Sequence, residues 1–211
     1  MLRLSPGASL EVFDGEGGRY RAVLAEDGAL ALSGREETSA PRAPIVLAQA
    51  LIKGDKMELV VQKATELGAS AIAPFSSERS VVQLTAARAR DRVVRWQRIA
   101  EAAARQCGRA DVPTVHGVGT LSDVLARGRS IGARSIVLWE REKSRRLAQA
   151  AAEADALLVA VGPEGGFSDA EIERARAAGA CTASLGERIL RSETAPIAAL
   201  SVLLFLAGEL G

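Results

Sequence analysis

The sequence predicts an α/β protein with a mostly parallel sheet covered by helices on both faces, preceded by a small β unit. Three observations support this fold class. The chain has 211 residues, 48% of them hydrophobic, which is enough to bury one good core with a small appendage. From Ile45 onward, apolar runs of strand length alternate with stretches of helical periodicity. Before Ile45, short segments of alternating polarity are separated by glycine-rich turns.

The first unit, residues 1–43, is expected to be a β meander. Three short strands are marginal on their own, so they need a surface to pack against. The stretch 36–44 contains Pro41 and Pro44 and is expected to connect this unit to the second one, residues 44–211. The expected strands of the first unit are 9–15, 19–27 and 29–34.

The second unit alternates strands and helices to the end of the chain. Asp55 is expected to cap its first helix and Gly68 to end that helix. Ser168 and Glu171 have the spacing of a capping box at the start of another helix. Ligands of such sheets bind beyond the carboxyl ends of the strands. The expected elements are strand 45–52, helix 55–67, strand 71–75, helix 85–106, helix 121–126, strand 135–140, helix 144–154, strand 156–162, a helix from 168, strand 182–186 and a final apolar helix over 195–207.

Composition excludes several classes of function. With 27 basic and 26 acidic residues, the net charge is +1, so any affinity for nucleic acid must come from local clustering. Two cysteines and one histidine are too few for a zinc cluster or a disulfide framework, and no metal is expected. The longest apolar stretch, 195–207, is shorter than the roughly 20 residues that span a bilayer. We therefore expect no membrane partner, no signal peptide and a reducing cytoplasm as the compartment.

The most informative segment is 157–168, LLVAVGPEGGFS. An apolar strand runs into two adjacent glycines and a capped helix start, which brings bare backbone N–H groups close to a ligand. The alternative is a tight turn that needs glycine for positive φ. The loop is neither a GxGxxG fingerprint nor a GxxxxGK[ST] phosphate loop, so an ordinary dinucleotide fold and a P-loop NTPase are disfavoured.

A second candidate segment is 185–196, LGERILRSETAP, which also follows a strand. A structural reading makes Ser192 or Thr194 the cap of the last helix and Glu193 an acid in its first turn. That reading leaves Arg191 unexplained, because a cation near a helix N-terminus opposes the helix dipole. Arg191 therefore suggests an anionic partner.

A basic window lies between Arg79 and Arg109, with eight arginines against two acidic residues. Arg88, Arg92 and Arg95 share one face of the predicted helix and are placed to meet RNA phosphates. A solvated helix face explains the same pattern equally well. Aromatic residues form only 3% of the chain, which argues against a base-stacking platform.

Five segments then occur in an order that matches one known family. They are KGDKMELVVQKATELG (53–68), PFSSERSVV (74–82), RWQRIAEAAARQCGR (95–109), VGPEGGFSDAEI (161–172) and LGERILRSETA (185–195). Together they resemble the bacterial 16S ribosomal RNA uridine-N3 methyltransferases of the SPOUT superfamily. Five ordered motifs are far more specific than any one of them.

This resemblance implies a SPOUT methyltransferase domain over 44–211, with a trefoil knot at its C-terminal end. Knots are so rare that ordinary topology rules would not suggest one. The resemblance also implies an N-terminal PUA-like β domain over 1–43 that helps hold RNA, here incomplete because its opening strands are missing. Members of the family act as homodimers on 16S rRNA of the 30S subunit, and the apolar last helix is the candidate interface.

The resemblance further implies roles for individual residues. Arg191 and Arg79 are expected to stabilise negative charge on the target uracil or to anchor its phosphate, and Glu193 is the candidate base, with helix capping as its alternative role. S-adenosylmethionine is expected to contact Leu138, Gly162, Pro163, Glu164, Gly165, Gly166, Leu185, Gly186, Ile189 and Leu190. RNA is expected to contact Lys53, Lys63, Arg88, Arg92, Arg95 and Arg109.

Three other readings stay open. A related SPOUT enzyme would keep the fold and the cofactor but methylate another RNA, such as transfer RNA. A catalytically silent RNA-binding module is possible because the N-terminal unit is short. A nucleotide-dependent enzyme of ordinary doubly wound topology is disfavoured by the missing early glycine fingerprint.

Overall fold

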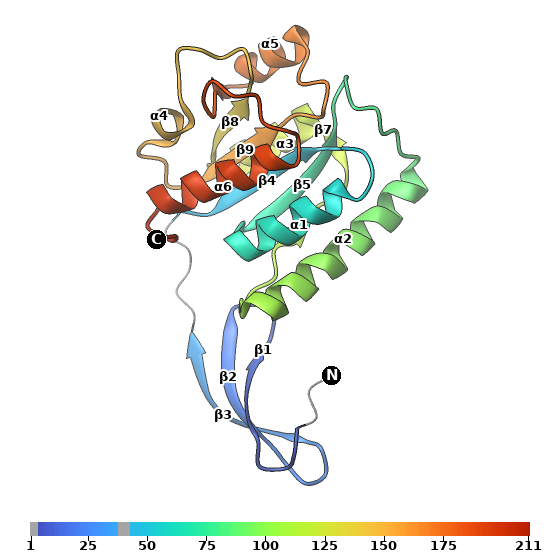
Figure 1. Cartoon of the computed structure of the whole chain (residues 1–211), viewed down its shortest axis with the longest axis vertical. Helices are drawn as coiled ribbons and strands as arrows, with labels where there is room; N and C mark the ends of the chain where they lie inside the picture. Colours follow the sequence, from blue (N-terminus) through green and yellow to red (C-terminus); the bar gives the residue numbers. More distant parts are fainter. Residues whose placement is uncertain (1–3, 38–42) are drawn as a thin grey trace.

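The computed structural model describes residues 4–37 and 43–211, in two connected parts (Figure 1). A three-stranded antiparallel sheet projects from one end of a larger α/β unit. Its strands are β1 (Ser9–Phe13), β2 (Gly18–Leu24) and β3 (Leu30–Glu37), paired in the order β1-β2-β3. The three expected strands are therefore confirmed, although β3 runs three residues further than expected. Residues 38–42 of the expected connection, Pro41 among them, lie outside the described residues.

The small sheet contacts the α/β unit through the turn between β1 and β2. The N–H of Gly17 donates to the carbonyl of Ala110 at 3.2 Å, and the N–H of Val112 donates to the carbonyl of Gly15 at 3.1 Å. Asp14 shapes this turn by accepting hydrogen bonds from the backbone of residues 16 and 18, each at 2.8 Å. The small sheet is thus held against the chain that follows the long helix.

The α/β unit is built on a parallel sheet in the order β10-β8-β9-β4-β5-β6, with β7 also paired to β5. The two central strands, β4 and β9, are buried along their whole length, which explains their uninterrupted apolar sequences. The strands are β4 (Ile45–Ala50), β5 (Ala71–Ser76), β6 (Thr114–Val115), β7 (Gly119–Thr120), β8 (Arg134–Leu138), β9 (Leu157–Val161) and β10 (Cys181–Ala183).

Helices cover both faces of this sheet, as predicted. Along β4, Ile45 and Leu47 point into one apolar core and Val46 and Ala48 into the other, the alternation expected of a strand between two layers. The first core lies under α1 (Lys56–Leu67), α2 (Ala86–Cys107), α4 (Leu147–Ala151) and α6 (Thr194–Leu206). The second lies under α3 (Leu121–Ser130) and α5 (Asp169–Ala177).

Some helix ends follow the predicted signals and others do not. Gly68 ends α1 in the left-handed conformation, with φ of 112°, and Ser168 and Glu171 form the expected capping box of α5. The expectation that Asp55 caps α1 with its side chain is wrong. Asp55 stands at the cap position with φ −86° and ψ 7°, far from the extended backbone that capping requires, and its side chain makes no capping bond.

The segment before α4 corrects a second expectation. The helix expected over 144–154 is only five residues long, because the chain before it pairs with the end of β10 instead. The N–H of Ser184 donates to the carbonyl of Arg145, and the N–H of Leu147 donates to the carbonyl of Ser184, each at 3.0 Å. At the start of α6, the cap residue is Glu193, rather than Ser192 or Thr194, and its side chain makes no capping bond.

Across residues 4–37 and 43–211, no helix has the length and apolar character that a bilayer crossing requires. The same residues contain no group of three or more His, Cys, Asp or Glu side chains that could hold a metal ion.

Candidate functional site

A pocket of about 570 Å³ opens at the carboxyl ends of β8, β9 and β10, where the fold class predicts a ligand site. Three segments form its walls: residues 138–140, 161–167 and 184–193, with Lys56 at the start of α1. The structure brings together all ten residues predicted to contact the cofactor, since each one lines this pocket. Arg191 and Glu193 line it as well, whereas Arg79 does not.

The glycines of the first loop lie close to neighbouring side chains. A Cβ atom on Gly162 would lie 3.1 Å from the ring of Phe167, and one on Gly165 would lie 3.2 Å from the Cβ of Arg79. Gly166 has φ of +66°, and a Cβ there would lie 2.9 Å from a carboxylate oxygen of Glu140. Any side chain at these positions would therefore displace a neighbour or strain the loop that bounds the pocket.

Two neighbouring segments hold the glycine loop in place. The N–H of Lys53, in the turn before α1, donates to a carboxylate oxygen of Glu164 at 3.0 Å. On the other side, the guanidinium of Arg79 donates to the carbonyl of Gly165 at 3.2 Å. Arg79 thus contacts the side of the glycine loop that faces away from the pocket, and its hydrogen bond helps to fix the position of the loop.

Arg79 lies in a turn whose neighbouring residue, Glu78, bonds to the start of α5. The hydroxyl of Ser168 donates to the Glu78 carboxylate at 2.5 Å, Arg174 forms an ion pair with it, and the Glu78 N–H donates to Glu171 at 3.0 Å. The hydrogen bond from Ser168, followed by that from Arg174, holds the pKa of Glu78 below its usual range. The turn and the glycine loop therefore form one connected unit.

The loop after β8 contributes an aromatic wall to the pocket, at the end of the strand segment 136–140 that the family resemblance places among the cofactor loops. Trp139 lines the pocket, and the Arg141 guanidinium lies 4.7 Å from the centre of its ring. Nearby, Glu142 accepts hydrogen bonds from the hydroxyls of Ser144 and Thr182, at 2.6 and 2.5 Å. These bonds, the one from Ser144 foremost, lower the pKa of Glu142 to about 2.

Four charged residues of the pocket lie in the wall formed by 184–193. Arg191 is exposed, and within the part of the chain that the structure describes its guanidinium has no acidic partner. Its carbonyl accepts hydrogen bonds from Thr194 and Ala195, each at 2.9 Å, which fixes its backbone against the first turn of α6. An arginine held near a helix N-terminus and lining a pocket remains available to an anionic ligand, as its sequence position suggested.

Glu193 forms an ion pair with Lys56, at 3.1 Å between carboxylate oxygen and Nζ. Partial burial raises the pKa of Glu193, but hydrogen bonds from its own backbone N–H, from Lys56 and from Ser192 outweigh that effect, so the pKa lies below its usual range. A carboxylate with a lowered pKa is a poor proton acceptor.

Sequence reasoning missed Lys56, although a signal was present. Lys56 is the first residue of α1, where a cation opposes the helix dipole, the same anomaly that singled out Arg191.

The matching family model, described as RNA methyltransferase domain, covers residues 38–204. The chain belongs to the RNA methyltransferase family. A Mycobacterium bovis protein named Ribosomal RNA small subunit methyltransferase E is 37% identical over 205 residues, covering 94% of this chain and 78% of that protein. The Bacillus subtilis protein of the same name is 39% identical over 165 residues, and the match spans 75% of this chain but only 64% of that relative.

Solved structures agree with this assignment. The crystal structure of a Ribosomal RNA small subunit methyltransferase E from Neisseria gonorrhoeae, bound to S-adenosyl methionine, superposes with a TM-score of 0.86 at 33% identity. The match covers 97% of this chain and 85% of that one. The fold class, an α/β methyltransferase with a parallel sheet, is thereby confirmed.

In this member of the RNA methyltransferase family, the basic window on α2 is partly neutralised by an acidic residue of another helix. Glu58 of α1 lies 2.7 Å from Arg95 and 3.8 Å from Arg92, measured from carboxylate oxygen to guanidinium nitrogen. The sequence indicates acidic partners only within α2 itself, so this pairing with the neighbouring helix could not be predicted. Lys63 of α1 is likewise paired, with Glu66 at 2.7 Å.

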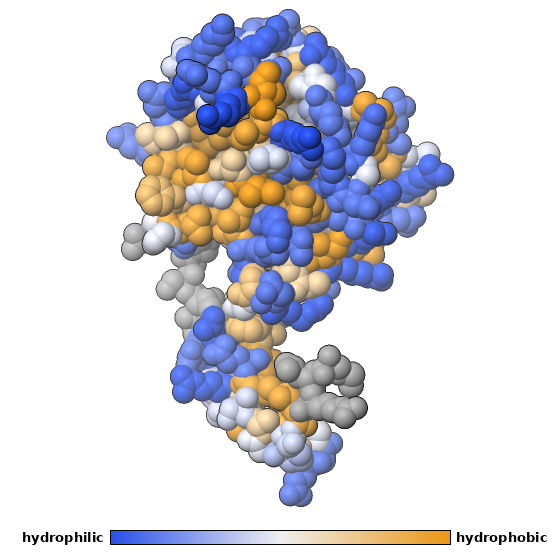
Figure 2. Space-filling view, viewed as in Figure 1, coloured by the Kyte–Doolittle hydropathy of each residue, from blue (hydrophilic) through white to orange (hydrophobic). Residues whose placement is uncertain are grey.

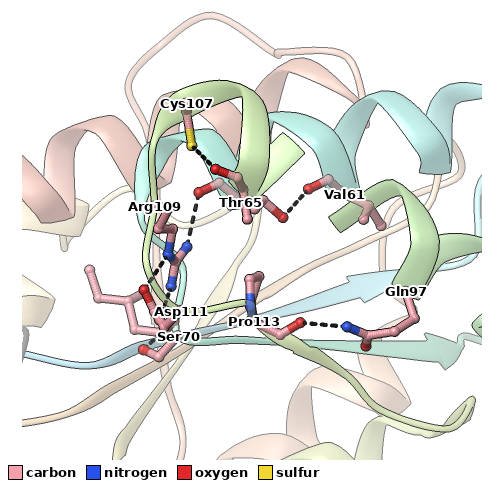
Figure 3. Close-up of polar contacts among 10 residues, drawn as sticks. Val61, Thr65, Ser70, Gln97, Cys107, Arg109, Asp111 and Pro113 are labelled. Carbon is pink, nitrogen blue, oxygen red and sulfur yellow. Dashed lines mark hydrogen bonds and ion pairs between the residues drawn. The ribbon is translucent and has the colours of Figure 1, made fainter. Parts of the chain in front are cut away.

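Arg109 makes contacts within the protein that link parts of the fold (Figure 3). Its guanidinium donates to the carbonyl of Thr65 in α1 at 2.9 Å and forms an ion pair with Asp111 at 2.7 Å, and only 14% of its side chain is exposed. Gln97 of α2 adds a second link, donating to the carbonyl of Pro113 and accepting from the N–H of Val115. Arg109 therefore joins α1 to the segment on which the small sheet rests, and contact with RNA is not needed to explain it.

Apolar side chains gather on the surface over α6, as Figure 2 shows. Phe205 is 65% exposed and Leu206 is 53% exposed, and Val202 and Leu210 are also exposed. Ile189, on the pocket wall, is 82% exposed. Contiguous exposed apolar surface of this kind is typical of an interaction site.

Proposed function

We propose that this protein methylates N3 of a uridine in 16S rRNA of the small ribosomal subunit, with S-adenosylmethionine as the methyl donor. The observation that carries the proposal is the pocket at the strand ends, whose walls combine a glycine loop with Arg191. The names of the relatives and the cofactor in the Neisseria gonorrhoeae structure support the donor and the RNA class.

The residues of the pocket fit this donor. Leu138, Leu185 and Ile189 line the pocket and offer apolar contact, and the glycines of the 162–166 loop line it without side chains, which leaves room for a ligand close to the backbone. We assign the ten cofactor residues named above to its binding. When bound, S-adenosylmethionine supplies an electrophilic methyl group on a positively charged sulfonium.

Residues of the chain must promote the loss of the proton from uracil N3. That N–H is a weak acid, so the enzyme must favour the uracil anion through a base or a cation. In our proposal, Arg191 binds the uracil oxygens or the adjacent phosphate, and Arg79 holds the glycine loop at Gly165. The lowered pKa of Glu193 favours a role as an ion-pair partner over the role of base.

The domains take the roles that the family resemblance implies. We propose that residues 44–211 form the SPOUT domain, with the segment after β10 threaded into a trefoil knot beside the glycine loop. Residues 1–43 act as a PUA-like RNA-docking unit. Arg88, with no acidic partner among the described residues, is the arginine of the predicted RNA face best placed to meet phosphates, and Lys53 adds a cation beside the pocket.

We further propose that the protein is a homodimer in the cytoplasm, with α6 at the interface. The exposed side chains of Phe205 and Leu206 support this arrangement, since an apolar helix face of this kind is covered in a closed dimer.

Methyl transfer to three RNA substrates tests the function. Purified protein and S-adenosylmethionine are incubated with unmodified 30S subunits, free 16S rRNA and transfer RNA, and nucleosides are mapped by mass spectrometry. We expect N3-methyluridine at one position of 16S rRNA. Methylation of transfer RNA alone would move the target to another RNA, and cofactor binding without transfer to any of the three would indicate a silent RNA-binding module.

A further inference from the structure

We propose that Lys56 is a further catalytic residue, which contacts the target uracil and stabilises the negative charge left when N3 loses its proton. This inference rests on the proposed function and adds a group to its site. Lys56 lines the pocket together with the glycine loop and the 184–193 wall, and its ammonium lies 3.1 Å from the Glu193 carboxylate.

The fold holds Lys56 in place from both sides of the sequence. The turn before it is tied to the glycine loop by the hydrogen bond from Lys53 N–H to Glu164. The turn of α1 that follows it is anchored by Met57, Val60 and Val61, which are buried in the first core. The backbone of Lys56 is thus held in place, so its flexible side chain reaches only one region of the pocket.

The ion pair with Glu193 leaves hydrogen-bond donors of Lys56 free. An ammonium has three N–H donors and Glu193 uses one, so the others remain available. The side chain of Lys56 is 39% exposed and that of Glu193 is 13% exposed, so the lysine is the partner that is more accessible to a ligand. The charged groups that share the pocket or adjoin Lys56 are Asp55, Glu140, Glu164, Glu187, Arg188, Arg191 and Glu193.

The chemistry of the reaction gives this cation a task. As the N3–H bond breaks, its proton passes to water and its electron pair stays on uracil, shared among N3 and the two carbonyl oxygens. That pair then forms the bond to the methyl carbon, while the electrons of the broken carbon–sulfur bond remain on sulfur. An opposite charge within about 4–6 Å lowers the pKa of such an acid by about 1–3 units. A lysine repels the sulfonium, so its charge suits the uracil side of the pocket.

Single-turnover rates across pH test the proposal in the full-length protein on unmodified 30S subunits. We expect Lys56→Met to slow transfer near neutral pH by about 10- to 1000-fold. Its rate should keep rising, about tenfold per pH unit, above the pH at which the wild-type rate becomes constant. Affinity for S-adenosylmethionine, measured by calorimetry, should stay within about threefold of wild type, and Lys56→Arg should restore most of the rate.

Two further variants separate charge from structure. The double variant K56M/E193Q avoids a partly buried carboxylate without its partner, and we expect it to show the same pH profile as Lys56→Met. Lys143→Met, which removes an exposed lysine outside the pocket, should behave as wild type.

A Lys56→Met profile parallel to that of wild type would overturn the assignment while leaving the proposed function intact. A large loss of cofactor affinity with an unchanged rate at saturating donor would also overturn it, by placing Lys56 on the donor. Absence of transfer by the wild-type protein would overturn the proposed function and this inference together.

Discussion

Gly166→Ala is the substitution whose consequences can be worked out most fully. Gly166 has φ of +66°, a conformation that costs a residue with a Cβ about 1–2 kcal/mol. The new Cβ would also lie 2.9 Å from the Glu140 carboxylate, which is the end of an exposed side chain and must move. We therefore expect a stability loss of about 1–2 kcal/mol, or about 2–8 °C in Tm for a chain of this size. Because the loop bounds the pocket, affinity for S-adenosylmethionine should fall at least about tenfold.

Gly132→Ala is a matched control for this prediction. Gly132 has φ of +69°, nearly that of Gly166, lies in the turn between α3 and β8, and a Cβ there would meet no atom within 4 Å. Both variants should show similar shifts in thermal unfolding, while calorimetry should find weakened donor binding only for Gly166→Ala. Wild-type affinity in Gly166→Ala, or an equal loss in Gly132→Ala, would refute the assignment of this loop to the donor.

Three other changes give distinct readouts. Phe167→Ala removes a fully buried ring stacked on Phe75 and should lower the free energy of unfolding, measured in urea, by about 3–5 kcal/mol. The surface substitution Ile131→Ala should change this free energy by less than about 0.5 kcal/mol, and equal effects of the two would contradict the packing. Arg191→Ala should reduce single-turnover rates on 30S subunits much more than donor affinity, and an unchanged rate would remove Arg191 from the mechanism. The pKa of Glu142 is lowered from 4.5 to about 2, so the stability that this carboxylate contributes is present above pH 4.5 and is lost as the pH falls toward 2. Glu142→Gln should remove this part of the pH dependence of stability. A pH dependence identical to that of wild type would show that the carboxylate contributes nothing.

The sequence was sufficient to predict the layers of the fold and the edge at which the pocket lies. Strand and helix periodicities are local properties, and the carboxyl ends of parallel strands meet at one edge whatever the strand order. The family resemblance assigned the segments 162–166 and 185–191 to one cofactor site, and the structure places both on one pocket.

The pairings between distant side chains could not be predicted, because they depend on how helices pack. Glu58 meets Arg95 and Lys56 meets Glu193 only because α1 lies beside both α2 and α6. The short α4 has a similar cause, since hydrogen bonds with Ser184 replace the helix that the composition of 144–154 favours. Local propensity was overridden by tertiary structure at these places.

A crystal structure of this protein soaked with S-adenosylmethionine is the sharpest test of whether the loops after β8, β9 and β10 enclose the methyl donor. Our expectation is density for the donor between residues 162–166 and 185–191, in contact with backbone N–H groups of both loops. Density for the donor elsewhere on the protein, or a pocket filled by its own side chains at saturating donor, would contradict it.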